Sequence, residues 1–231
     1  MTTSSLPKGR VNICTPDAVI ETSVLRVRKS SPVPTGARRY NRQAFLQTIH
    51  TMLPHEKDNN LALLLASLGI SDALLARKAL PFHPDARELA PAETSADGRT
   101  HLLIPPASKS WSAMKAAAYE DGIVIEIVSA FRDVEEQAQI ILDKQARGMD
   151  MEAILTLSAP PGYSEHHTGR AVDINTPGCE EREEPFEATE AFRWLTTHAA
   201  RFGFVLSYPR GNALGFIYEP WHWFYQPGAQ A

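Results

Sequence analysis

The segment Ser164-Glu-His-His-Thr-Gly-Arg-Ala-Val-Asp173, followed by Glu219-Pro-Trp-His-Trp223, decides how this chain of 231 residues folds around a site. In the first segment, Gly169 permits a tight backbone turn between a loop and a short strand. The turn lets His166 fold back toward Asp173. Val172 and Ile174 alternate with Asp173 and therefore face the core on the other side of the strand. A histidine and a carboxylate thus converge at one point.

The second segment places an acid and a histidine three residues apart, with a proline between them. Pro220 excludes an ordinary helix there and favours an extended Glu219. Positions three apart face opposite sides of a flat strand, so the chain must bend or bulge at Pro220 if Glu219 and His222 are to reach one site. Trp221 and Trp223 would then alternate away from His222 and pack as apolar supports.

The two segments together offer the parts of a metal-assisted reaction. His166, Asp173 and His222 would give a metal three protein ligands and leave one position open, which is the ligand count of a catalytic zinc. Glu219 beside that position would act as the general base. Taken singly, each segment is also compatible with a structural role, because a histidine between two tryptophans can simply pack and an aspartate at a strand end often caps a turn.

At these residues the sequence resembles the VanY-type D-alanyl-D-alanine carboxypeptidases. These are zinc peptidases related to the VanX dipeptidases, to L,D-carboxypeptidases of cell-wall recycling, to phage endopeptidases and to the hedgehog signalling domain. The pattern Ser-x-His-x-x-Gly-x-Ala-x-Asp, followed by Glu-x-Trp-His, is matched without a gap. Ser129-Ala-Phe-Arg132-Asp-Val-Glu-Glu-Gln137 resembles a third family segment. The resemblance covers roughly residues 95–226 and leaves residues 1–80 outside it.

The resemblance implies roles for further residues. It implies one Zn²⁺ at the three ligands above, with Glu219 as the base. It also implies that Arg132 steadies the developing oxyanion, a role that suits a fixed guanidinium in a cleft of low dielectric constant. Gln137, Ser164 and Tyr208 are expected to contact the substrate, although Ser164 can instead only cap its loop and Tyr208 can instead only pack.

The hydrophobic pattern predicts the elements around these segments. Gly and Pro positions and apolar spacing divide the chain into an irregular arm at 1–40, a helical extension at 41–80 and a domain at 81–231, whose first part, 81–98, reads as a loop. The resemblance implies that residues 81–231 form the zinc carboxypeptidase domain. Helices are expected at 106–120, 133–145 and 189–202, with a shorter one from residue 150, and strands at 123–129, 170–175, 204–208 and 216–225, the last two as an antiparallel hairpin. The expected fold class is α+β, a small antiparallel sheet with flanking helices around a zinc cleft, hedgehog/VanY-like, plus the N-terminal helical extension.

Composition excludes several other classes of protein. The net charge is −4 and no Lys/Arg block stands out, so a nucleic-acid partner is not expected. No run of 18 apolar residues predicts a membrane span. With only Cys14 and Cys179 and no CxxC, a disulfide framework and a cysteine-based zinc site are not expected. We expect His167, beside His166, to be a bystander, and the acidic run Glu180–Glu184 to be a solvated loop.

The expected function is release of the C-terminal D-alanine from a peptidoglycan peptide or muropeptide. The first residues lack the apolar core of a secretory signal, so we expect a cytoplasmic enzyme, or a periplasmic one if a leader has been trimmed. In the cytoplasm an L,D-carboxypeptidase acting on recycled tetrapeptides is favoured, because trimming pentapeptide precursors would remove the donor for cross-linking. A D,D-carboxypeptidase, a phage-lysin-type endopeptidase and a non-catalytic zinc-stabilised module remain alternatives. An intact base and oxyanion donor, Glu219 and Arg132, argue against the last.

Overall fold

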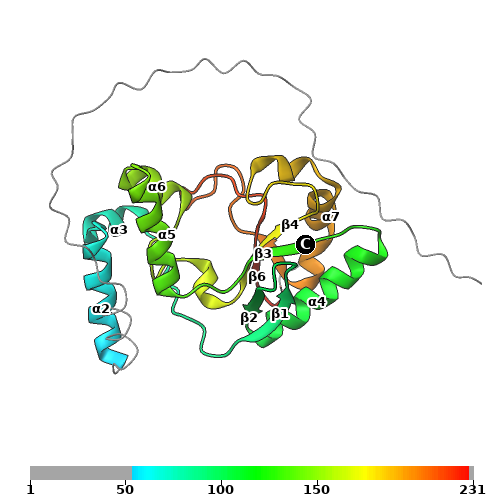
Figure 1. The fold of residues 1–231 in the computed structure, drawn as a ribbon, viewed down its shortest axis with the longest axis horizontal. Helices are drawn as coiled ribbons and strands as arrows, with labels where there is room; N and C mark the ends of the chain where they lie inside the picture. Colours follow the sequence, from blue (N-terminus) through cyan, green and yellow to red (C-terminus); the bar gives the residue numbers. More distant parts are fainter. Residues whose placement is uncertain (1–53, 229–231) are drawn as a thin grey trace, which may run out of the picture.

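The computed structural model describes residues 54–228. The expected arm at 1–40 and the helical extension up to residue 53 lie outside the described residues. Within them, helices and strands alternate along the chain (Figure 1). They run in the order α2 (Pro54–Ser67), α3 (Asp72–Lys78), β1 (Ala90–Thr94), β2 (Thr100–Leu103), α4 (Pro105–Glu120), β3 (Glu126–Ser129), α5 (Val134–Ala146), α6 (Met151–Leu157), β4 (Ala171–Asn175), α7 (Glu190–His198), β5 (Phe204–Leu206) and β6 (His222–Tyr225), with short 3₁₀ turns η1 (Glu165–Thr168), η2 (Glu184–Ala188) and η3 (Ala199–Phe202).

A four-stranded antiparallel sheet with the order β3-β4-β6-β5 forms the centre of the fold. Its register sets Asp173 on β4 directly opposite His222 on β6, and Ser129 on β3 opposite Asp173. Side chains alternate across the strands, so Val172 and Ile174 enter the core with 0% exposure while Asp173 faces the other way. The α+β class with a small antiparallel sheet and flanking helices is confirmed.

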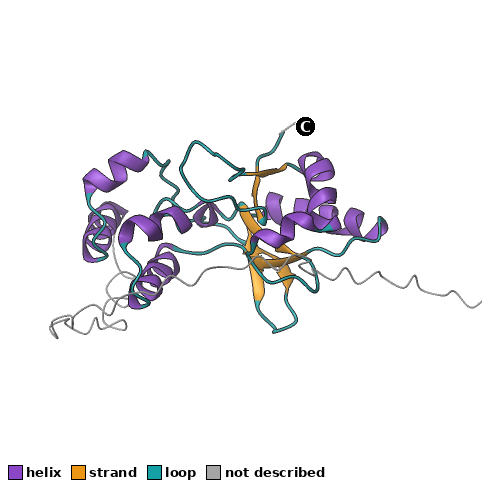
Figure 2. Cartoon of the chain, turned by 90° about the horizontal axis from the view of Figure 1, so that it is seen from above, coloured by secondary structure: helices purple, strands orange, loops and turns teal. Residues whose placement is uncertain are grey.

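Helices α4 and α7 cover the apolar face of this sheet, as Figures 1 and 2 show. The apolar stripe of α4, Trp111, Met114 and Ala118, is fully buried. Trp221 and Trp223 join the same cluster, as the sequence predicts, and Trp223 lies beside Val172 on the apolar face of the sheet. Burial of large aromatic side chains contributes roughly 1.5–3 kcal/mol each. Packing on the apolar face of the sheet therefore stabilises the strand that carries His222.

A second group of helices lies on the other side of the sheet in Figure 1. Leu64, Leu65 and Leu68 of α2 form one apolar cluster with Ile141 of α5 and Ile154 of α6. Helix α5 starts where the sequence predicts, because Asp133 accepts a hydrogen bond from the backbone N–H of Glu136 in a complete capping box. A domain boundary at residue 80 stays a prediction.

The expectation of a loop over 81–98 is wrong for its second half. Ala90–Thr94 and Thr100–Leu103 pair as the antiparallel hairpin β1–β2, with a register shift after Pro91. The strand sequence Ala-Pro-Ala-Glu-Thr has no apolar alternation, so local pattern gives no signal. Tertiary contacts fix it instead, since Glu93 accepts a hydrogen bond from the indole N–H of Trp111 at 3.0 Å.

The last expected strand is also shorter than predicted. Residues 216–221 are irregular, and strand β6 begins only at His222. A turn at Pro220 and Trp221, closed by His222 N–H donating to Glu219 C=O at 3.1 Å, replaces the first half of the strand. The expected bend at Pro220 is therefore present, and the antiparallel pairing of β5 with β6 is confirmed.

Across the described range, no single helix is both long and apolar enough to cross a membrane, although the segments Asn60–Ser67 and Asp72–Lys78, bent by 95°, meet the length and composition criteria as a pair.

Candidate metal centre

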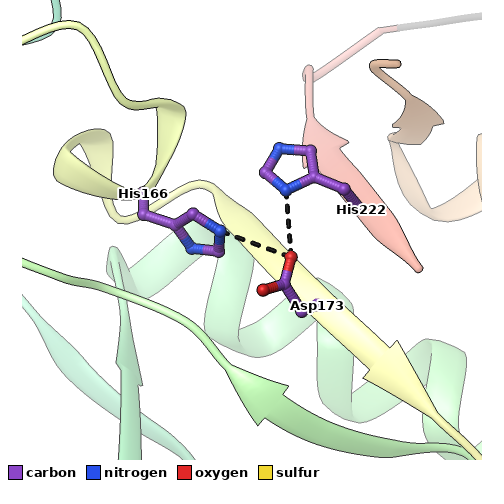
Figure 3. A group of neighbouring side chains, drawn as sticks. All are labelled: His166, Asp173 and His222. Carbon is purple, nitrogen blue, oxygen red and sulfur yellow. Dashed lines mark hydrogen bonds and ion pairs between the residues drawn. The ribbon is translucent and has the colours of Figure 1, made fainter. Parts of the chain in front are cut away.

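Three buried side chains from different elements meet at one point beside the sheet. His166 comes from turn η1, Asp173 from β4 and His222 from the first position of β6. One ligand atom from each lies within 4.8 Å of the others. Figure 3 shows the two rings approaching the same oxygen of Asp173 from different sides, with Nε2 of His166 at 3.3 Å and Nδ1 of His222 at 3.0 Å. The structure thus brings together the three predicted ligands.

Gly169 makes the first of these approaches possible. It has φ +62° and ends turn η1, with its N–H donating to His166 C=O. A Cβ at this position would lie 3.1 Å from the backbone nitrogen of Ile104 and 3.0 Å from Leu89. Only glycine combines the left-handed backbone with this close approach. The reversal from His166 into β4 therefore depends on it, as expected.

Hydrogen bonds on the far side of each ring decide which nitrogen faces the centre. The Nδ1–H of His166 donates to Ala130 C=O at 2.6 Å, which leaves the lone pair of Nε2 toward Asp173. The Nε2–H of His222 donates to the Glu165 carboxylate at 2.8 Å, which leaves Nδ1 toward Asp173. Such outer partners fix the tautomer and orientation of metal-binding histidines. Sequence reasoning missed Glu165, whose only signal is an acid directly before the ligand histidine.

The electrostatics of the group suit a divalent cation. Burial alone would raise the pKa of Asp173, but the charges and hydrogen bonds of His166 and His222 outweigh it and hold that pKa well below its usual range. Burial lowers the pKa of His166 to about 4. For His222 burial acts in the same direction, yet hydrogen bonds to Asp173 and Glu165 outweigh it and raise the pKa to about 10. The carboxylates of Asp173 and Glu165 therefore favour a positive charge at this buried group, and a bound metal ion would provide that charge. The donor set of two imidazoles and one carboxylate fits zinc.

Glu219 lies beside this group with only 9% of its surface exposed. Its carboxylate is 3.9 Å from Nδ1 of His222, and its N–H donates to Tyr208 C=O. Burial raises the pKa of Glu219 to about 7, against the lowering effect of His222. A carboxylate with a pKa near neutral is suited to take up and release a proton.

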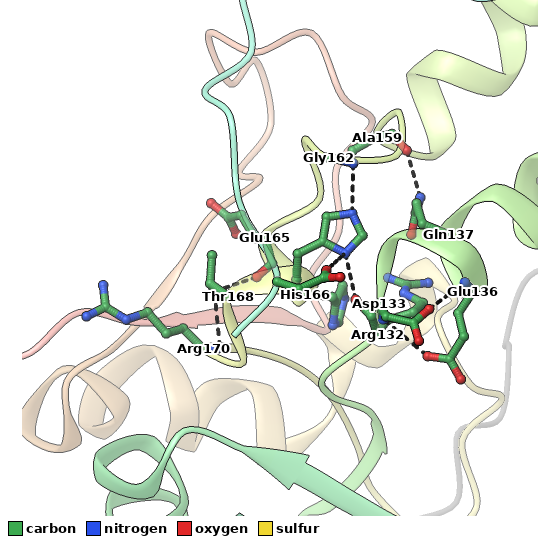
Figure 4. Close-up of polar contacts among 12 residues, drawn as sticks. Arg132, Asp133, Glu136, Gln137, Ala159, Gly162, Glu165, His166, Thr168 and Arg170 are labelled. Atoms are coloured by element: carbon green, nitrogen blue, oxygen red, sulfur yellow. Dashed lines mark hydrogen bonds and ion pairs between the residues drawn. The ribbon is translucent and has the colours of Figure 1, made fainter. Parts of the chain in front are cut away.

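The remaining predicted residues line one cleft of about 670 Å³, which His166 and His222 also line: Arg132, Gln137, Ser164 and Tyr208. Arg132 is half-buried in the loop between β3 and α5, and its buried Nε has no hydrogen-bond partner among the described residues. Gln137 donates from Nε2 to Ala159 C=O at 2.7 Å and leaves its buried Oε1 without a described partner (Figure 4). Unpaired polar atoms in a buried cleft are available to a ligand.

The other two residues predicted to contact substrate, Ser164 and Tyr208, differ in the contacts that their side chains make. Ser164 precedes η1 but its side chain makes no capping hydrogen bond there. The ring of Tyr208 stacks on the His222 ring at 4.7 Å between centroids, so it supports a ligand whether or not it contacts substrate.

The acidic run is not a remote loop. Glu181, Glu183 and Glu184 line the cleft, and so do the basic residues Lys144 in the last turn of α5 and Arg147 directly after that helix. Residues 180–184 are exposed, as expected of a solvated loop, but nothing local in the sequence shows that this loop borders the cleft.

Comparisons with known proteins agree on one family. The family model VanY, described as D-alanyl-D-alanine carboxypeptidase, matches residues 100–228. A D-alanyl-D-alanine carboxypeptidase of Enterococcus faecalis V583 is 35% identical over 119 residues, which are 47% of this chain and 42% of that protein. The structure of the LdcB LD-carboxypeptidase, solved to explain peptidoglycan recognition, matches with a TM-score of 0.50 at 29% identity and covers 62% of this chain and 65% of LdcB.

A third match supports the fold alone. The vancomycin-resistance D,D-dipeptidase VanXYg, solved with a D-Ala-D-Ala phosphinate analogue, has a TM-score of 0.53 at 23% identity and covers 64% of this chain and 62% of VanXYg. The chain spans about two fifths of the E. faecalis relative and about two thirds of LdcB.

Proposed function

The chain belongs to the VanY family of D-alanyl-D-alanine carboxypeptidases, and from that membership we propose that it is a zinc-dependent carboxypeptidase that releases the C-terminal D-alanine from peptidoglycan peptides. The observation that supports this most strongly is the buried group of His166, Asp173 and His222 with Glu219 beside it. A purely structural metal site has no use for a further residue beside its three ligands, here a buried carboxylate with a pKa near neutral.

His166, Asp173 and His222 would hold the zinc ion. Zinc bound there supplies Lewis-acid polarisation of the scissile carbonyl and lowers the pKa of water to about 7. The chain contributes the geometry, because Ala130 C=O and the Glu165 carboxylate fix the two rings before any metal binds. That preorganisation removes part of the ordering cost of binding.

Glu219 moves the proton. Its carboxylate accepts a proton from the attacking water and returns it to the nitrogen of the departing D-alanine, so the group ends the cycle as it began. The turn at Pro220 aims Glu219 and His222 at the same point, which a straight strand would not do.

Arg132 would stabilise the negative charge that develops on the carbonyl oxygen during the reaction. Its guanidinium has a buried, unpartnered Nε and lies in the cleft that Glu219 also lines. A fixed donor in a water-poor site is worth more than the same donor in water, since no solvent has to reorient during the reaction.

Of the possible peptidoglycan substrates, we favour tetrapeptides, on which the chain would act as an L,D-carboxypeptidase. The likeness to the LdcB LD-carboxypeptidase supports this choice. The likeness to the E. faecalis D-alanyl-D-alanine carboxypeptidase favours a D,D-enzyme acting on pentapeptides. The ratio of kcat/KM on matched tetrapeptide and pentapeptide muropeptides decides between them: a preference for the tetrapeptide supports the L,D assignment, and a preference for the pentapeptide overturns it.

The products of the reaction separate the remaining alternatives. Free D-alanine from an intact muropeptide supports a carboxypeptidase. Cleavage inside the peptide without D-alanine release means a phage-lysin-type endopeptidase, and zinc binding without any cleavage means a non-catalytic module. A cytoplasmic location stays a prediction that cell fractionation tests.

A further inference from the structure

His167 occupies a position of the metal motif that binds no metal, yet its side chain is completely buried, with 0% exposure. We propose that His167 is a positioning residue that holds the Arg132 loop against the metal motif, an inference that rests on the function proposed above. The expectation that His167 is a bystander is correct only in that its ring points away from the metal ligands.

The hydrogen bonds of His167 settle which nitrogen carries the proton. Gly162 N–H donates to Nε2 at 3.1 Å, so Nε2 must be the acceptor and Nδ1 must carry the hydrogen. The Nδ1–H then donates to Arg132 C=O at 2.6 Å. The ring therefore bridges two loops that are 30 residues apart in sequence.

The neighbouring contacts tie Arg132 to the metal motif on both sides of its Cα. Arg132 N–H donates to His166 C=O at 3.3 Å, and His166 Nδ1–H donates to Ala130 C=O at 2.6 Å. With the bond from His167, both peptide groups of Arg132 are anchored to two successive residues of one turn. The guanidinium Nε has no described partner that could orient it. The backbone hydrogen bonds of Arg132 therefore direct its side chain into the cleft.

His167 is itself held by a segment that precedes the region matched by the family. Ala86 N–H donates to His167 C=O at 2.7 Å, and His83 N–H donates to Gly162 C=O at 2.7 Å. Asp85 places a carboxylate oxygen 3.5 Å from Nδ1. Since the ring is fixed at its backbone and at both nitrogens, it can transmit position from this segment to Arg132.

Loss of the imidazole should therefore misplace Arg132 and leave the metal ligands in place. His166 and His222 keep their own outer partners, Ala130 C=O and the Glu165 carboxylate. A displacement of about 1 Å at a reacting group can cost up to about 10²-fold in rate.

The test compares three variants of the full chain with bound zinc. His167→Leu removes both hydrogen bonds and should lower kcat by roughly 10- to 100-fold with zinc content unchanged. His167→Gln keeps one donor and one acceptor and should restore most of kcat. His101→Leu is the matched control, because His101 is also a buried histidine, bonded to Ser95 in the β1–β2 hairpin, and does not line the cleft. It should lower stability without changing kcat.

A double-mutant cycle with Arg132→Ala distinguishes positioning from general damage. If His167 acts through Arg132, His167→Leu causes little further loss of kcat once Arg132 is absent. Full additivity overturns the proposal, as does a loss of zinc in His167→Leu or an equal loss of kcat in the His101→Leu control. D-alanine release by the unmodified protein is measured first, so that a failure of the proposed function is seen separately.

The contacts can also be tested without any variant, should His167→Leu not fold. In the unmodified, metal-free protein the amide hydrogen of Gly162 should exchange slowly, and the ¹⁵N shifts of the His167 ring should report the Nδ1–H tautomer at pH 7. Fast exchange at Gly162 or the opposite tautomer overturns the assignment.

Discussion

The Glu165 carboxylate and the His222 ring lie 2.8 Å apart, oxygen to Nε2, in a partly buried pair that turns Nδ1 of His222 toward Asp173. His166 is held differently, by the neutral carbonyl of Ala130. The two histidine ligands therefore differ in donor strength, since an ionised partner makes an imidazole more basic than a carbonyl does.

Glu165→Gln should weaken zinc binding by about 10- to 100-fold, because the amide preserves shape but loses the charge. Competition with a chelator of known affinity measures the change. Glu152→Gln is the matched control: Glu152 is exposed on α6 and pairs there with Arg77. Equal zinc affinities in the two variants would show that Glu165 does not support His222.

Glu219→Gln should separate catalysis from metal binding. The amide cannot accept a proton, so kcat should fall by roughly 10²- to 10⁴-fold while zinc content stays at one per chain. Elemental analysis alongside D-alanine release checks both parts. Turnover near that of the unmodified chain would mean that another group is the base.

Arg132→Ala should act on kcat rather than on KM, because the guanidinium meets charge that exists only in the transition state. The expected loss is about 2–4 kcal/mol of transition-state stabilisation. Steady-state kinetics on a muropeptide give the split. A rise in KM alone would assign Arg132 to binding of the ground state.

The pH dependence of stability should depend on His167. Burial lowers the pKa of its imidazole to about 4, with the Arg132 carbonyl opposing this effect in part. Between pH 6.5 and 4 the unfolded chain therefore binds a proton that the folded chain does not, so the stability fully present at pH 7 is lost as the pH falls through this window. The loss attributable to His167 is on the order of 3 kcal/mol.

Denaturant unfolding of the metal-free protein at pH 7 and pH 4.5 measures this loss, and His167→Gln should flatten it. Using metal-free protein in both cases keeps the contribution of His166 the same. Parallel pH profiles for the two proteins would contradict the assignment.

Most of the fold follows from periodicity and caps in the sequence. The α4 stripe, the capping box at Asp133 and the alternation around Asp173 each predict an element whose local preference agrees with its tertiary place. The β1–β2 hairpin cannot be predicted from such patterns, because Ala90–Thr94 has no apolar alternation and is held by contacts with α4.

The site likewise contains residues that the sequence predicts and contacts that it does not. His166, Asp173, His222 and Glu219 are predictable because their chemistry is local to two short segments. The partnership of Glu165 with His222 spans 57 residues, and that of His167 with Arg132 spans 35. The first depends on the pairing of β4 with β6 and the second on the pairing of β3 with β4, since the register of the strands decides which side chains meet.

Titration of the metal-free protein with zinc, followed by release of D-alanine from a tetrapeptide muropeptide, tests the central claim most directly. The account predicts no release without metal, a linear rise with added zinc and a plateau at one zinc per chain. Release by the metal-free chain, or no release from a chain that has bound its zinc, would contradict it.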